Sequence, residues 1–82
     1  MYRARPRLPP GLDRLLKREL ETAIDQANLG ETDTYIARQY LIAQVPQIDI
    51  AGALGVERST ISRRLPRILE RVIWAAGRMG LF

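Results

Sequence analysis

Apolar residues recur at intervals of three and four over most of the chain, the spacing that places side chains on one face of an α-helix. The first series predicts a helix over about residues 12–28, which stops at Asn28, Leu29 and Gly30. Its apolar face comprises Leu12, Leu15, Leu16, Leu20, Ala23, Ile24 and Ala27. The chain has no internal repeat and no strand pattern of useful length, so the fold is expected to be all-α.

A second helix is predicted from a cap at Thr32 or Asp33 to about Gln44. The chain is expected to leave this helix at Val45, because a residue that precedes proline, here Pro46, disfavours the helical conformation. The apolar set of the helix comprises Tyr35, Ile36, Tyr40, Leu41 and Ile42.

Residues 47–66, QIDIAGALGVERSTISRRLP, predict a helix over 47–54, a glycine turn and a second helix. Ala51 is small enough for the point where two crossed helices approach most closely, and Gly55 can take the positive φ that ends a helix cheaply. Val56 is expected to fill the turn. The positions expected to face inward are Ile50, Leu54, Ile61 and Leu65.

The second helix of this segment is predicted to start near Arg58, with Glu57 at or before its start and Ser59 as a competing cap. Pro66 predicts its end, because a proline inside a helix forfeits a hydrogen bond and kinks the axis. A bend or break and a further helix to about Arg78 should follow, which gives a small bundle of four to five helices over residues 11–82.

An apolar stripe continues after the proline and is longer than a compact three-helix unit can cover. It comprises Ile68, Leu69, Val72, Ile73 and Ala76. Part of the stripe is therefore expected to pack on the first helix or on a second copy of the protein. Trp74 lies beside the stripe and fits either a core edge or a dimer contact.

Composition excludes several kinds of site. The chain has 82 residues and neither cysteine nor histidine, which removes disulfides, thiolate metal sites and the commonest general base. No enzyme activity, cofactor or metal is expected. No apolar run approaches the roughly 18 residues of a membrane span, and no signal-peptide core follows the N-terminal arginines. A cytoplasmic protein without membrane contact is the expectation.

The net charge of +4 is unevenly distributed. Residues 1–10 hold three arginines and three prolines and are predicted to form a flexible basic arm. Residues 11–33 carry six acids and three bases, whereas residues 57–82 carry six bases and two acids. This distribution favours a polyanionic partner over a solvated basic surface. The arm either reaches into a minor groove or remains a disordered tail.

The segment 47–66 resembles the DNA-binding helix-turn-helix over all twenty residues, including Ala51, Gly55 and Ile61. Residues 34–72 resemble the fourth region of bacterial sigma factors and its small stand-alone relatives, some of them phage or mobile-element regulators. The matching features are RQYL at 38–41, IDIAGALGVERSTISRRL, and the basic apolar helix that follows. The resemblance implies promoter recognition, with the second helix of the motif in the major groove.

The chain departs from that family at two places. Residues 43–47, AQVPQ, stand where sigma-type domains usually have an acidic residue and a glycine or similar turn, and Pro66 interrupts a helix that is normally continuous. The ending RRLP is similar to the DNA-binding tails of serine recombinases, although this chain has no catalytic domain of that kind.

By position in the motif, the resemblance implies two sets of DNA-contacting residues. The residues expected to face base edges are Arg58, Ser59, Ser62 and Arg63. Arginine can bond both acceptors of guanine, whereas serine specifies weakly. The residues expected at phosphates are Gln47, Thr60, Arg64 and Arg67. The alternative for each arginine is a solvated surface residue.

The leading hypothesis is a non-enzymatic, sequence-specific protein that binds double-stranded DNA and regulates transcription. Because one such module binds weakly, tight binding would need a homodimer through residues 66–78, with recognition helices about 34 Å apart, or help from RNA polymerase. The alternative is a protein-interaction adaptor, which docks on polymerase or an anti-sigma partner without reading DNA. An adaptor has no need of Arg58, Arg63 and Arg64 in an outward row.

Overall fold

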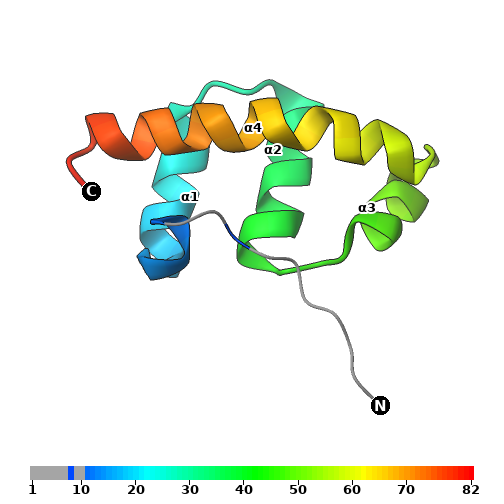
Figure 1. Cartoon of the computed structure of the whole chain (residues 1–82), viewed down its shortest axis with the longest axis horizontal. Helices are drawn as coiled ribbons and strands as arrows, with labels where there is room; N and C mark the ends of the chain where they lie inside the picture. Colours follow the sequence, from blue (N-terminus) through cyan, green and yellow to red (C-terminus); the bar gives the residue numbers. More distant parts are fainter. Residues whose placement is uncertain (1–7, 9–10) are drawn as a thin grey trace, which may run out of the picture.

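The computed structural model describes Leu8 and residues 11–82, which form four α-helices and two shorter helical turns without any β-strand (Figure 1). The α-helices are α1 (Lys17–Gln26), α2 (Glu31–Ala37), α3 (Gln47–Leu54) and α4 (Arg58–Arg78). A 3₁₀ turn, η1 (Leu12–Arg14), precedes α1, and a π-helical turn, η2 (Arg38–Ile42), continues α2. The all-α prediction is confirmed over these residues. Of the predicted arm over residues 1–10, all but Leu8 lies outside the described residues, and Leu8 packs half-buried against the core.

The longest helix, α4, crosses α1 and α2 and packs on α3 at its N-terminal end (Figure 1). Its inward face is buried along nearly its whole length: Ile61, Leu65, Ile68, Val72, Ala75 and Ala76. The apolar stripe that continues beyond the proline is therefore covered largely by the other helices of the same chain. Leu69 and Ile73 are half-buried and the adjacent Trp74 is 56% exposed, so the edge of the stripe remains open to solvent.

The predicted break at Pro66 is wrong, because α4 continues through this residue to Arg78. A proline inside a helix costs about 3 kcal/mol. A continuous helix, however, brings Ile68 and Val72 into the core together with Ile61, and each fully buried aliphatic side chain contributes about 1.5–3 kcal/mol. Pro66 and Ser62 are both exposed, so water can reach the side of α4 where the hydrogen bond is lost.

The predicted first helix is divided into two parts. Leu15 and Leu16 are extended, with ψ of 147° and 155°, and α1 begins only at Lys17. The Glu19 carboxylate accepts a 2.8 Å hydrogen bond from the Leu16 N–H and stabilises this start. The break lets Leu12 be fully buried but leaves Leu16 54% exposed, so the expectation that Leu16 shares the apolar face is wrong. The predicted stop at residues 28–30 is confirmed.

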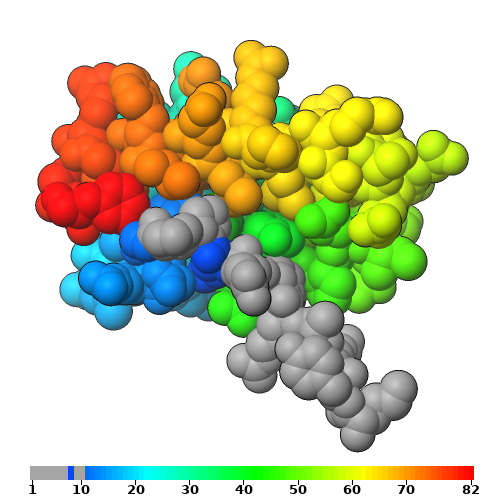
Figure 2. Space-filling view, viewed as in Figure 1, coloured from blue at the N-terminus to red at the C-terminus, as the bar shows by residue number. Residues whose placement is uncertain are grey.

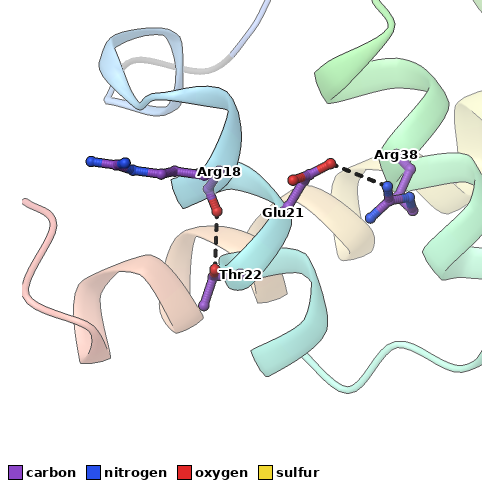
Figure 3. Close-up of polar contacts among 4 residues, drawn as sticks. All are labelled: Arg18, Glu21, Thr22 and Arg38. Atoms are coloured by element: carbon purple, nitrogen blue, oxygen red, sulfur yellow. Dashed lines mark hydrogen bonds and ion pairs between the residues drawn. The ribbon is translucent and has the colours of Figure 1, made fainter.

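The second helix begins at Glu31, before either predicted cap. Gly30, with φ of 90°, is the N-cap of α2, and neither Thr32 nor Asp33 caps it. Asp33 instead pairs with an arginine of α4, which gives its carboxylate a partner other than the helix start. The Arg38 guanidinium of η2 pairs with Glu21 of α1 at 3.3 Å (Figure 3). The helical path ends at Ile42, close to the predicted end.

Candidate nucleic-acid interface

The segment that comprises α3, the turn after it and the start of α4 has the predicted form of helix, glycine turn and helix. α3 spans Gln47–Leu54, and Gly55 adopts the left-handed conformation with φ of 70°. The Val56 N–H donates to the Ala51 carbonyl at 3.0 Å, which closes the turn through the backbone. Because backbone hydrogen bonds close the turn, no side chain needs to fill it. Val56 is 40% exposed, and the expectation that it fills the turn is wrong.

The N-cap of α4 is Glu57, whose extended backbone precedes the first helical residue, Arg58. The Glu57 carbonyl accepts a hydrogen bond from the Thr60 N–H at 3.0 Å. Ser59 therefore lies inside the first turn of the helix and does not cap it. Its side chain is exposed and available to a ligand.

The inward positions of this segment pack as predicted. Ala51 is buried, as expected of a small residue between helices that pack directly on each other. The other inward residues are Ile50, Ile61 and Leu65, which are buried, and Leu54, which is half-buried. The core therefore determines which side of α4 faces away from the protein.

The four residues predicted to face base edges are all exposed: Arg58, Ser59, Ser62 and Arg63. With about 3.6 residues per turn, Ser59 and Arg63 lie opposite the buried Ile61. Neither Arg58 nor Arg63 forms an ion pair or a side-chain hydrogen bond with any described residue. Both guanidinium groups are therefore free to bind a ligand.

The four residues predicted to contact phosphate differ in their surroundings. Arg67 is exposed and unpaired among the described residues, whereas Arg64 Nη1 lies 2.7 Å from Asp33 Oδ1. Thr60 is half-buried on the flank of α4. The Oε1 atom of Gln47 is buried with no hydrogen-bond partner among the described residues. A phosphate contact by Gln47 would therefore involve its amide nitrogen or its backbone N–H at the start of α3.

A hollow lies next to Arg67, between α4 and the loop that joins α1 to α2. It has a volume of about 260 Å³ and is lined by Asn28, Leu29, Asp33, Arg67, Ile68 and Arg71. Arg71 is committed to the fold, because its Nε and Nη2 atoms donate to the Ala27 carbonyl at 3.1 and 2.9 Å. The guanidinium of Arg71 thus provides a hydrogen-bond donor for a carbonyl at the C-terminal end of α1, where the helix dipole also favours a positive charge.

Sequence reasoning missed two features of this surface. Asp33 and Arg64 lie 31 residues apart, and no local pattern joins them. The second feature, a contact between Trp74 and Arg78, has a sequence signal, because residues four apart face each other on a helix. Arg78 lies with its guanidinium carbon 4.9 Å from the centre of the Trp74 ring.

Candidate metal sites and membrane-spanning helices are both absent from the described part of the chain. Within the described residues, no group of three or more acidic side chains could hold a metal ion. None of the helices formed by residues 11–82 is both long and apolar enough to cross a bilayer. The surface around the start of α4 offers hydroxyl and guanidinium donors, which suit an anionic ligand with acceptor groups.

Three comparisons with known proteins were negative: no protein-family model, no curated protein and no solved structure matches this chain.

Proposed function

We propose that this protein binds double-stranded DNA in a sequence-specific manner and regulates transcription. In this proposal α3 and α4 act as a helix-turn-helix, and the first half of α4 lies in the major groove. The observation that carries the proposal is the exposure of Arg58, in the first turn of α4, and of Arg63, on its outward face, neither of them paired with a described residue. A guanidinium fork that is not committed elsewhere can bond both acceptors of guanine.

The surroundings of each side chain suggest different roles. Arg63 and Arg58 supply base recognition, while Ser59 and Ser62 add weaker contacts to base edges or sugars. Arg67 supplies a phosphate contact, since its charge is not neutralised by any described residue. Arg64 contributes to phosphate binding only to the extent that DNA competes with Asp33 for its guanidinium.

The size of the module limits its affinity. One recognition helix buries a small area, and tight specific binding requires a further contact. A homodimer through residues 66–78 or a contact with RNA polymerase would supply it. Ile68, Val72 and Ala76 are buried, so a dimer contact there would rest on the half-buried Leu69 and Ile73 and the exposed Trp74.

Selection from a random duplex library at about physiological salt tests this function. The purified protein should enrich one sequence motif, and the enriched duplex should bind more tightly than a scrambled duplex of equal length. A two-fold symmetric motif would indicate a dimer. Binding that is weak, sequence-independent and abolished by salt would reject sequence-specific recognition and favour a protein adaptor.

A further inference from the structure

The outward face of α4 continues beyond the residues assigned to base recognition. Arg67, Trp74 and Arg78 lie on one flank of the helix, and we call these three residues the α4 ridge. All three are exposed, and α4 is open to solvent along its length in the space-filling view (Figure 2). Arg71, which shares the flank, is held by the Ala27 carbonyl and is not included.

Trp74 and Arg78 contact each other within the ridge. The ring of Trp74 is 56% exposed, and the Arg78 guanidinium lies over it at 4.9 Å. A guanidinium that stacks on an aromatic face keeps the N–H groups at its edge available for hydrogen bonds. Stacking also restricts the flexible arginine, so less conformational freedom is lost when an anion binds. In this arrangement the guanidinium of Arg78 lies against an exposed aromatic ring.

We propose that the α4 ridge binds the phosphate backbone of the same DNA duplex, outside the part of the groove that Arg63 reads. This inference rests on the proposed function. Arg67 and Arg78 have no acidic partner among the described residues, and Glu70 is the one acid in α4. The charge of the ridge is thus complementary to phosphate.

The length of α4 fits this assignment. Arg63 and Arg78 are separated by about 22 Å along the helix axis, at roughly 1.5 Å per residue. The major groove of B-DNA is about 12 Å wide, so a helix of this length that crosses the groove at Arg63 extends to the sugar–phosphate backbone at its edge. Arg78 is therefore the binding residue at the far end of the ridge, and Trp74 is a positioning residue that acts through it.

Fluorescence of Trp74 provides a direct test, because it is the single tryptophan of the chain. In a titration of the full chain with duplex DNA, the complex should protect Trp74 from quenching by acrylamide. The Arg78→Ala variant should lower the slope of log binding constant against log salt by about 0.9, the value for one lost phosphate contact. Arg78→Lys should retain the slope, because it keeps the charge.

Matched controls separate the ridge from a general effect of charge. Arg18 is an exposed cation of α1 that points away from the Glu21–Arg38 pair (Figure 3), and Arg18→Ala should leave the slope unchanged. Trp74→Phe should behave like wild type, and Trp74→Ala should weaken binding at each salt concentration with little change in slope, because Arg78 keeps its charge but loses its stacking partner. A purely structural role would instead change thermal stability. Far-UV circular dichroism checks that each variant is folded.

The outcomes also distinguish this inference from the proposed function. Enrichment of a DNA motif with Trp74 still fully quenchable and an unchanged Arg78→Ala slope would overturn the ridge contact alone. Sequence-independent binding that still protects Trp74 and depends on Arg78 would support the ridge contact and reject specific recognition. No binding to duplex DNA at all would reject both.

Discussion

Arg64 Nη1 lies 2.7 Å from Asp33 Oδ1 and joins α4 to the first turn of α2. The pair neutralises one of the basic residues on the flank of the proposed recognition helix. It also places a carboxylate next to the surface where phosphate would lie. An intramolecular ion pair at this position competes with DNA for the guanidinium of Arg64.

Asp33→Asn should therefore strengthen binding to duplex DNA of any sequence. The substitution frees Arg64 and removes a negative charge, so the salt slope should rise in magnitude by up to about 0.9. Both side chains are partly exposed, so the free energy of unfolding should fall by no more than about 1 kcal/mol. Asp25→Asn is the matched control, since Asp25 is an exposed acid on α1. Equal effects of the two variants would show that only net charge matters.

Arg63→Ala and Arg67→Ala should have different effects on DNA binding. Arg63→Ala should cost about 1–3 kcal/mol on the selected duplex and relax the base preference at one position. Arg67→Ala should weaken specific and scrambled duplexes about equally and lower the salt slope by about 1. Titration of both duplexes at several salt concentrations measures each quantity. If the two variants behave alike, the proposed orientation of α4 on DNA is wrong.

Pro66→Ala should stabilise the fold. Alanine restores an N–H group inside α4 at an exposed position where proline makes no buried contact, and the gain is expected to reach up to about 3 kcal/mol. Chemical denaturation monitored by circular dichroism measures the free energy of unfolding. Pro66→Gly, which restores the N–H but has poor helix propensity, should gain about 1 kcal/mol less than alanine. A loss of stability in Pro66→Ala would show that the proline ring has a packing role.

Two glycines of the α3 region should respond to alanine in opposite directions. A Cβ atom would meet nothing within 4 Å at either Gly52 or Gly55. Gly55 has φ of 70°, so Gly55→Ala should destabilise the protein by about 1–2 kcal/mol. Gly52 lies inside α3, where Gly52→Ala should stabilise by about 0.5–1 kcal/mol. Thermal melts of the two variants check the signs, and Gly55→Asn should cost less than Gly55→Ala because asparagine tolerates this conformation.

Local chemistry explains which parts of the fold could be predicted from the sequence. The bounds of α3 and the left-handed Gly55 follow from residues within a few positions of each other, and both predictions are confirmed. The break at Leu15 and Leu16 was missed because all the leucines there fit one helical face. Only packing decides that Leu12 is buried and Leu16 is not.

Tertiary packing also overrides the local rule at Pro66. The rule describes an isolated helix, whereas here the stripe on both sides of the proline is buried against α1, α2 and α3. For the candidate site, Arg58 is exposed because it lies at the end of α4, and the exposure of Ser59 and Arg63 followed from the helical period. The partner of Arg64 did not, because an ion pair between residues 31 apart depends on how α2 and α4 are placed in the fold.

The unbroken α4 has a mechanical consequence for any DNA that it binds. Arg63 and Arg78 belong to one continuous helix that packs on three other helices. If both residues bind the duplex, the helical rise between them sets their separation, and the local shape of the DNA has to match it. The duplex must then supply the deformation, and sequences that bend readily beside the recognised bases would bind better than stiff ones. Part of the sequence preference would thus come from base pairs that no side chain touches.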